Sequence, residues 1–313
     1  MSGKVAVVGS LNMDIVVNVE RLPEEGETVH GSGVYEAPGG KGANQAAALG
    51  KLGTQVAMIG LVGADANGGG LLASLRQAGV DTRAVRMSKR ATGLAYITVD
   101  GAGRNHIIVV SGANGELSAA DIELHRQTLE QCDIVVLQLE IPLETVVYTL
   151  RLAKELGKTT VLNPAPARRL DEELLQYVDF LIPNEHELRV LTGRAELDEA
   201  GVPEASAILL GKGARAVIVT LGEKGCFYTD GRESEFFAAH KVVPLDTTAA
   251  GDSFIGGFAA GYAEERDVRK AIGLAITAAA ITVTRRGAQS SLPARDEVDR
   301  FLKYKSLYDC VYK

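Results

Sequence analysis

A run of small residues around Asp252 carries the strongest chemical signal in this sequence. The segment Asp246-Thr-Thr-Ala-Ala-Gly251-Asp252 leads directly into a glycine-rich helical pattern. Main-chain amides of residues 250–252 would then lie at a helix N-terminus, which favours an anion. A carboxylate in that turn can accept a hydroxyl proton and orient the attacking oxygen of a phosphoryl transfer, where positioning matters more than basicity. An ordinary N-cap aspartate is the structural alternative.

A second glycine-rich segment precedes another helical pattern. In Pro38-Gly-Gly-Lys41-Gly-Ala-Asn44, three glycines in four positions allow backbone amides to approach a ligand closely. The segment is not a Walker A loop, because Tyr35 stands where that motif needs its first glycine and Gly42 where it needs Ser or Thr. The pattern favours a ligand-binding loop over a plain glycine turn, since turning the chain rarely needs Lys and Asn as well.

Polar residues also follow the first apolar run of the chain. Val5–Val8 is followed by Gly9-Ser-Leu-Asn12-Met-Asp14. In an open α/β sheet, ligands bind in the crevice outside the carboxyl ends of the strands. Asn12 and Asp14 can exchange hydrogen bonds there with a polyhydroxylated ligand, although both residue types also cap helices and turns.

Two weaker signals come later in the chain. Asn184-Glu-His-Glu187 follows an apolar strand and begins a helix, so its carboxylates can hold Mg²⁺ through water or simply occupy a helix start. Thr220-Leu-Gly222-Glu-Lys-Gly225 follows another strand, and its glycines suit close approach to nucleotide phosphates. A hairpin turn explains this second segment equally well.

The elements that position these residues alternate between short Val/Ile-rich runs and amphipathic helical stretches, which predicts a mainly parallel sheet covered by helices. The expected strands are Val5–Val8, Val56–Leu61, Ile134–Leu139, Thr159–Leu162, Phe180–Ile182 and Val217–Thr220. The expected helices are Ala43–Leu52, Gly69–Ala78, Ala119–Glu130, Leu143–Leu156, Glu204–Gly211, a glycine-rich helix from Gly251, and Val268–Val283.

Two segments, 15–37 and 91–111, have a different periodicity of apolar residues. Apolar and polar positions alternate in them, as in Gly93-Leu-Ala-Tyr-Ile-Thr-Val99. Period-two alternation predicts strands with one wet face, so we expect a small separate sheet that serves as a lid or a subunit contact.

Composition narrows the class of protein. The chain has 313 residues with a net charge of −7, which argues against a general nucleic-acid surface. No stretch approaches the roughly 20 uninterrupted apolar residues of a membrane helix, and the N-terminal apolar run is too short for a signal peptide. Three cysteines, Cys132, Cys226 and Cys310, stand far apart with no metal-ligand spacing. We therefore expect reduced thiols in a cytoplasmic protein that associates with neither membrane nor nucleic acid.

Taken together, the glycine-rich motifs resemble the ribokinase-type (PfkB) carbohydrate kinases, and the resemblance extends over nearly the whole chain. The matching segments are Gly9–Asp14, Pro23–Thr28, Gly39–Gln45, Ser111–Asn114, Gln138–Glu140, Asn163–Ala167, Asn184–Glu187, Thr220–Gly225, Asp246–Asp252 and Arg286–Ser290. The resemblance implies one α/β domain over residues 1–313: a three-layer α/β/α sandwich with a mostly parallel sheet and a small β-sheet lid inserted at 15–37 and 91–111. It also implies a homodimer formed through that lid.

The resemblance further implies transfer of the γ-phosphoryl group of ATP to a sugar hydroxyl, with O5 of D-ribose as the expected acceptor. The implied sugar-binding residues are Asn12, Asp14, Gly40, Lys41, Asn44 and Glu140. Asp252 would be the base and the amides of Ala249, Ala250 and Gly251 the anion hole. The implied nucleotide-binding residues are Asn184, Thr220, Gly222, Gly225 and Gly251. Glu187 would place Mg²⁺ through water, and a K⁺ site would use Asp246, Thr248, Thr282, Arg285, Gly287 and Ser291.

Two positions depart from that family's pattern, and several functions stay open. Ala249 stands where the family often has glycine, and Ile276 aligns where many members have an asparagine near the adenine. Deoxyribose, a nucleoside or another small sugar are alternative acceptors, since a few hydrogen bonds decide the choice. A non-catalytic sugar-binding regulator has no use for Asp252, and a dinucleotide oxidoreductase needs a glycine fingerprint that the first strand lacks.

Overall fold

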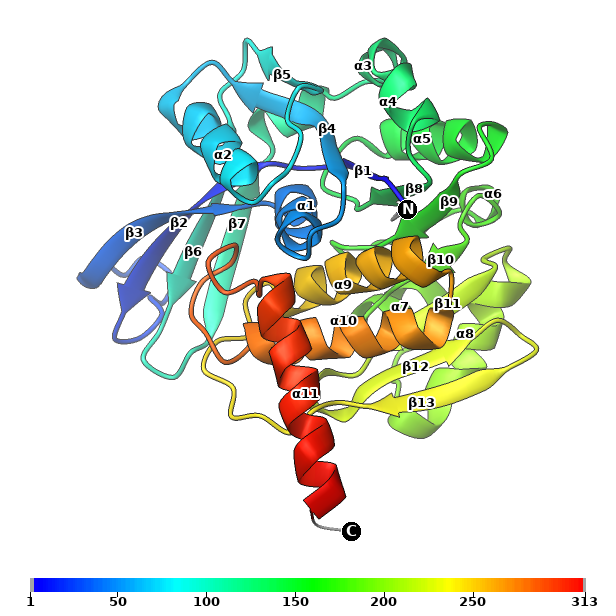
Figure 1. Cartoon of the computed structure of the whole chain (residues 1–313). Helices are drawn as coiled ribbons and strands as arrows, with labels where there is room; N and C mark the ends of the chain where they lie inside the picture. The colour runs from blue at the N-terminus through cyan, green and yellow to red at the C-terminus, as the bar shows by residue number, and fades with distance from the viewer. Residues whose placement is uncertain (1–2, 312–313) are drawn as a thin grey trace.

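A large twisted sheet with helices on both faces forms the body of the protein, and a smaller sheet stands off one side (Figure 1). The computed structural model describes residues 3–311, with side chains described as far as Tyr304. The strands of the large sheet run in the order β13-β12-β11-β10-β9-β8-β1-β4-β5. Neighbours from β5 to β11 pair in parallel, whereas β12 and β13 add an antiparallel edge.

The strands are β1 (Val5–Val8), β2 (Asn12–Val19), β3 (Gly31–Gly39), β4 (Val56–Gly63), β5 (Val85–Ser88), β6 (Gly93–Val99), β7 (Asn105–Val110), β8 (Ile134–Leu137), β9 (Thr159–Leu162), β10 (Phe180–Leu181), β11 (Ala216–Thr220), β12 (Gly225–Thr229) and β13 (Ser234–Ala238). The α-helices are α1 (Lys41–Lys51), α2 (Ala66–Gln77), α3 (Ala119–Leu124), α4 (Arg126–Glu130), α5 (Leu143–Glu155), α6 (Glu172–Leu175), α7 (Glu185–Thr192), α8 (Val202–Gly211), α9 (Ala250–Glu265), α10 (Val268–Thr282) and α11 (Arg295–Val311).

Alternate residues of each central strand enter different hydrophobic cores. In β1, Val5 and Val7 pack with helices α1, α2, α9 and α10, while Ala6 and Val8 pack with α5, α7 and α8 on the other face. All four residues are almost fully buried. This is the continuous apolar strand of a sheet that is covered on both sides, and it confirms the predicted α/β/α layering.

Close packing fixes helix α9 inside the first core. A Cβ atom added at Gly257 would lie 2.8 Å from the Cα of Ala275, and one added at Gly261 would lie 2.8 Å from the Cα of Ala271. A Cβ at Gly256 would lie 2.5 Å from the Cβ of Ala48 in α1. The glycines therefore let α10 and α1 approach α9 more closely than larger residues permit.

The smaller sheet has the order β3-β2-β6-β7, in which β2 and β6 pair in parallel and the outer pairs are antiparallel. It contains the two segments whose alternation predicted a separate sheet. One face of this sheet borders a cavity of about 820 Å³ through Val16, Ile97 and Ile107. The small sheet thus forms one wall of that cavity.

A crevice opens where the order of the strands reverses. From β1 the chain adds β4 and β5 on one side and then β8, β9, β10 and β11 on the other. The carboxyl ends of β1 and β8 therefore border a topological switch point, where ligands bind in open α/β sheets. Asn12 follows β1, and Glu140 follows β8.

The structure differs from the sequence-based expectations in one helix and at one edge of the large sheet. The predicted helix 119–130 is interrupted at His125, whose backbone (φ −108°) leaves the helical range between α3 and α4. The pair β12–β13 was not predicted.

Within the described side chains, Cys132 and Cys226 are free and buried, whereas the side chain of Cys310 lies outside the described part. None of the helices described between residues 3 and 311 is both long and apolar enough to span a membrane.

Candidate active site

Asp252 is a buried carboxylate on the first turn of α9. Its Oδ2 accepts a hydrogen bond from Asn44 Nδ2, and its Oδ1 accepts one from Gln45 Nε2, both at 2.9 Å. Burial raises the pKa of this carboxyl, while the Lys41 ammonium and the two amide donors oppose that rise. The side chain is therefore held in place by neutral donors beside one cation.

The turn that precedes Asp252 is strained and presents amides. Ala249, the N-cap of α9, has the left-handed conformation (φ 58°) that usually calls for glycine. The amide of Ala250 donates to Thr247 O at 3.2 Å. Since the first-turn amides of a helix have no carbonyl partner within it, the N–H groups of Gly251 and Asp252 mark the positive end of α9.

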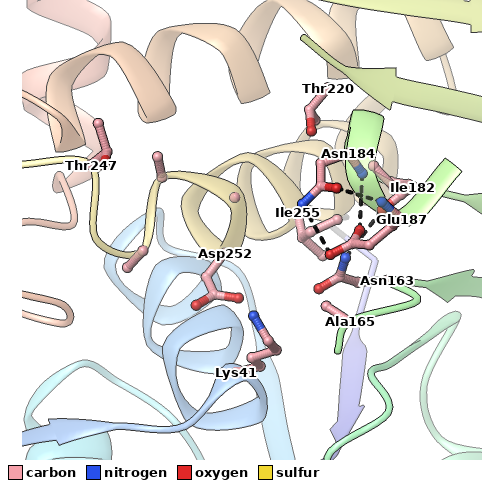
Figure 2. Close-up of a pocket in the computed structure, with 13 residues that line it drawn as sticks. Lys41, Asn163, Ala165, Ile182, Asn184, Glu187, Thr220, Thr247, Asp252 and Ile255 are labelled. Carbon is pink, nitrogen blue, oxygen red and sulfur yellow. Dashed lines mark hydrogen bonds between the residues drawn. The ribbon is translucent and has the colours of Figure 1, made fainter. Parts of the chain in front are cut away.

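The α1 loop meets Asp252 from the opposite side. Gly40, the N-cap of α1, has φ 88°, and a Cβ atom there would lie 2.6 Å from the backbone N of Asn12. Lys41 begins the helix and extends toward Asp252 (Figure 2). Burial lowers the pKa of Lys41, but the carboxylates around it raise it by more: Asp252, Glu140, Glu187 and Asp14.

The larger cavity, of about 820 Å³, contains all the residues predicted to bind a sugar: Asn12, Asp14, Gly40, Lys41, Asn44 and Glu140. Glu140 Oε2 accepts from Ser10 Oγ at 2.5 Å and from Lys41 N at 3.2 Å. Burial, together with the nearby Glu140 and Asp252, raises the pKa of Asp14 to about 7. Among the described residues, the buried Asn44 Oδ1 has no hydrogen-bond partner. The cavity therefore offers acceptors for several hydroxyl groups.

A smaller cavity, of about 240 Å³, adjoins the larger one at Asp252, and Figure 2 shows the residues that line it. It is lined by Asn184, Glu187, Thr220 and Gly251, all predicted to bind nucleotide or Mg²⁺. The two cavities share four lining residues: Lys41, Thr247, Ala249 and Asp252. The carboxylate thus stands at the boundary between two ligand-sized spaces.

Two predicted nucleotide-binding glycines do not line either cavity. Gly222 and Gly225 flank the 3₁₀ turn between the antiparallel strands β11 and β12. A Cβ atom at Gly225 (φ 109°) would lie 1.9 Å from Phe237 O of β13. The sheet edge itself therefore requires glycine at this position. Ile276, also expected near a nucleotide, packs in the apolar core.

The residues near Glu187 fit a Mg²⁺ ion held through water. Asn184 and Glu187 form a capping box, in which Glu187 accepts from the N (2.9 Å) and Nδ2 (3.1 Å) of Asn184. Burial raises the pKa of this carboxyl. No group of three or more His, Cys, Asp or Glu residues within the described part of the chain is arranged to ligate a metal directly. A single carboxylate facing a phosphate-sized cavity suits Mg²⁺, which keeps most of its waters.

The predicted K⁺ residues bring two loops together. Asp246 accepts hydrogen bonds from the amides of Thr248 and Gly287, both at 2.9 Å, which lower its pKa against the opposing effect of burial. The amide of Asp246 donates to Val283 O at 3.2 Å. An ionised carboxylate between two irregular loops, whose carbonyl oxygens could complete the ligand set, would suit a monovalent cation.

The other predicted K⁺ residues have partners elsewhere. Thr282 Oγ1 donates to Ser253 Oγ at 2.8 Å, and Ser291 Oγ donates to Ala288 O at 2.7 Å. The guanidinium of Arg285 pairs with Glu297 at 2.6 Å. The side chains of these residues are therefore engaged, and Thr282 O itself accepts a hydrogen bond from Arg285 N at 3.1 Å. A cation would have to be held by other backbone oxygens of these loops.

Sequence reasoning assigned no role to several polar residues that surround Asp252. Gln45, Gln138 and Asn163 form a hydrogen-bonded group beneath the carboxylate. The available signal was the amide pair Asn44-Gln45 inside an otherwise small and apolar helix, Gly42-Ala-Asn-Gln-Ala-Ala-Ala48. Polar side chains in such a helix need buried partners.

Two cavities that meet at a buried carboxylate beside a helix N-terminus form a site suited to group transfer on a ribokinase-like α/β fold. The sequence model described as "pfkB family carbohydrate kinase" matches residues 2–295. The chain belongs to this family.

Three relatives illustrate the similarity. A ribokinase of Haemophilus influenzae is 40% identical over 97% of this chain and 100% of its own. A deoxyribokinase of Salmonella typhi is 38% identical over 97% of this chain and 99% of its own. The solved structure of Arabidopsis thaliana ribokinase complexed with ribose and ATP has a TM-score of 0.88 and 34% identity, covering 97% of this chain and 99% of that one.

Proposed function

We propose that this protein transfers the γ-phosphoryl group of ATP to O5 of D-ribose, yielding ribose 5-phosphate and ADP. One observation carries the proposal: Asp252 and Lys41 line both cavities, so a hydroxyl group in the larger one and a phosphate in the smaller one would meet at this carboxylate. The similarity to ribokinases over nearly the full length supports the choice of both substrates.

The residues divide the chemistry between them. Asn12, Asp14, Asn44 and Glu140 bind the sugar hydroxyls in the larger cavity. Asp252 accepts the proton of O5 as the O5–Pγ bond forms and the bond from Pγ to the β-phosphate oxygen breaks. The amides of Ala249 and Gly251, at the start of α9, would face the charge on the transferred group, since a helix N-terminus stabilises negative charge. The amide of Ala250 would join them by leaving Thr247 O.

The nucleotide and its cations belong to the smaller cavity and its surroundings. Asn184 and Thr220 would line the ATP site, and Glu187 would hold Mg²⁺ through water. Gly222 and Gly225, in the turn that follows Thr220, would meet the nucleotide only where it extends beyond this cavity. Mg²⁺ neutralises the triphosphate when bound. K⁺ at the Asp246 loop would brace the turn that leads into α9, and its withdrawal from the assay should lower the rate.

The small sheet would act as a lid on a single α/β domain. Segments 15–37 and 91–111 supply its strands, and its inner face lines the sugar cavity. Closing this wall over bound ribose would exclude water, which otherwise consumes ATP by hydrolysis.

The outer face of the lid supports a homodimer. Tyr96 and Ile108 are cross-strand partners, as are Val17 and Val34, and Val110 continues the row. Tyr96, Ile108, Val34 and Val110 expose 44–69% of their surface. An apolar sheet face of this kind suits a second copy of the chain. Ile108→Glu should convert the dimer to a monomer in analytical ultracentrifugation, and an unchanged mass would exclude this interface.

The decisive assay compares acceptors at equal concentration. ADP formation and phosphosugar product are measured with ribose, deoxyribose and nucleosides, using the wild type and Asp252→Asn. We expect the highest kcat/KM with ribose and at least a thousandfold loss of kcat in the variant, with ribose binding retained. If Asp252→Asn forms ADP as fast as the wild type, Asp252 is not the catalytic base. If another acceptor has the higher kcat/KM, ribose is not the preferred substrate.

Deoxyribose is the second candidate acceptor, because the Salmonella typhi relative is nearly as similar as the ribokinases. The two sugars differ by one hydroxyl. A site that hydrogen-bonds this hydroxyl discriminates strongly against the sugar that lacks it, so the ratio of the two kcat/KM values settles the choice.

A further inference from the structure

The two oxygens of Asp252 have unequal surroundings. Oδ2 faces Asn44, which lines the larger cavity and keeps its own Oδ1 unpartnered among the described residues. Oδ1 faces Gln45, which is fully buried and lines neither cavity. One oxygen is therefore on the side of the sugar cavity, and the other is enclosed by protein.

The side-chain amide of Gln45 is oriented so that its NH₂ group, and not its oxygen, faces Asp252. Its Oε1 accepts a hydrogen bond from Gln138 Nε2 at 2.6 Å, so the NH₂ group must point the other way. That NH₂ group donates to Asp252 Oδ1 at 2.9 Å and to Asn163 Oδ1 at 3.2 Å. Both amide hydrogens and the carbonyl oxygen of Gln45 are thus used, and its orientation is determined on both sides.

The partners of Gln45 are themselves anchored in the sheet. Gln138 directly follows β8 and is fully buried, and a Cβ atom at Gly9 would lie 2.0 Å from its Oε1. Asn163 follows β9 and donates from Nδ2 to Ile182 O at 3.1 Å. Rigid strand ends therefore hold the amide that holds the carboxylate.

We propose that Gln45 is a positioning residue that fixes Oδ1 of Asp252, so that Oδ2 is the oxygen that accepts the substrate proton, and that Gln138 determines the orientation of the Gln45 amide. The proposal deepens the function proposed above and rests on it for the identity of the proton donor. A hydrogen bond to the ionised form also favours ionisation, so Gln45 keeps the base ready at lower pH.

Other charged groups act on Asp252 in both the wild type and the variants. Lys41 on α1 favours its ionised form, whereas Glu140 after β8, Asp14 on β2 and Glu187 on α7 oppose it. None of them contacts Gln45 through a hydrogen bond in the described structure. A change at Gln45 therefore alters one contact of Asp252 and leaves this charge pattern in place.

The test replaces the amide by an apolar side chain of similar length, Gln45→Met. Loss of one charge-assisted hydrogen bond should raise the titration midpoint of Asp252 by about one to two pH units. The midpoint is followed by the ¹³Cγ resonance of Asp252, which is assigned with Asp252→Asn and needs no substrate. The acid limb of the kcat profile should move by the same amount, and kcat should fall about 10- to 100-fold with ribose KM within threefold of the wild type.

Two further variants complete the design. Gln138→Met should give a smaller shift in the same direction, because it frees the Gln45 amide to rotate. Thr149→Val is the matched control: this buried hydroxyl bonds only within α5, and its removal should leave both profiles unchanged. If Gln45→Met does not fold, Gln45→Asn withdraws the donor by one methylene and tests the same contact.

An unchanged midpoint for Asp252 in a folded Gln45 variant would overturn the proposal. So would a rise in ribose KM at constant kcat, since that pattern belongs to a sugar ligand rather than to a positioning residue. The resonance titration is independent of the acceptor, so it still decides the role of Gln45 if ribose proves to be the wrong substrate.

Discussion

Replacing Asp14 by Asn should stabilise the protein while weakening its hold on the sugar. Asp14 is 9% exposed and lies near Glu140 and Asp252, and its pKa is raised from 3.8 to about 7 by burial and by these two carboxylates. Between those two pH values the folded protein keeps a proton that the unfolded chain has released. Stability therefore falls as pH rises through this window and is lowest above pH 7.

The magnitude follows from the size of that rise. About three pH units at about 1.4 kcal/mol each give about 4 kcal/mol, the upper limit of the gain from removing the charge at pH 8. At pH 4.5 the same substitution should gain only about 1 kcal/mol, because there Asp14 is protonated in the folded state anyway. Asn has the shape of the protonated carboxyl, so packing against Gly39 is preserved.

Urea unfolding of the wild type and Asp14→Asn at both pH values measures this difference, and ribose KM is measured alongside. We expect the substitution to raise the free energy of unfolding several times more at pH 8 than at pH 4.5. We also expect the KM for ribose to rise at least tenfold. A stability difference that is independent of pH would refute the reasoning, since the charge of Asp14 would then cost nothing in the folded state.

Three other substitutions or treatments test separate parts of the structure. Ala249→Gly should raise the free energy of unfolding by about 1 kcal/mol, because it relieves a left-handed alanine; a lower melting temperature would contradict this. Gly40→Ala should raise ribose KM at least tenfold and destabilise more than Gly53→Ala, which has a similar φ (80° against 88°) but no atom within 4 Å of the added methyl. Burial raises the pKa of Cys132 to about 11 and that of Cys226 to about 12, so peptides containing them should escape iodoacetamide at pH 8 until the chain is unfolded, and prompt labelling would contradict their burial.

The parts of the fold that repeat along the chain could be predicted from sequence. Apolar strands alternate with helices of regular period, so the parallel sheet and its covering followed from pattern alone. The strand β12, Gly225–Thr229, is buried on both faces and short, and it shows no alternation that marks it as a strand. The break at His125 depends on a local backbone angle that no residue type nearby demands.

In the candidate active site, too, some residues could be predicted from the sequence and others could not. Gly40 and Asp252 could be located because each stands in a run of small residues at the start of a helical pattern, together with polar residues that a plain cap or turn does not need. The contact between Gln45 and Gln138 joins residues 93 positions apart, and only the fold brings them together. The structure gives Gly225 a second reason to be glycine that the sequence did not reveal, because Phe237 O of the neighbouring strand occupies the space a side chain would need there.

The glycines that press α9 against α10 and α1 have a consequence for how acceptors change during evolution. A helix held by close contact on two sides has little freedom to shift, so Asp252 and the first-turn amides of α9 keep a fixed position. The small sheet β3-β2-β6-β7, which forms one wall of the larger cavity, shares no strand with the large sheet and is separate from α9. We expect new sugar preferences to arise by remodelling this wall, with the machinery for phosphate left untouched.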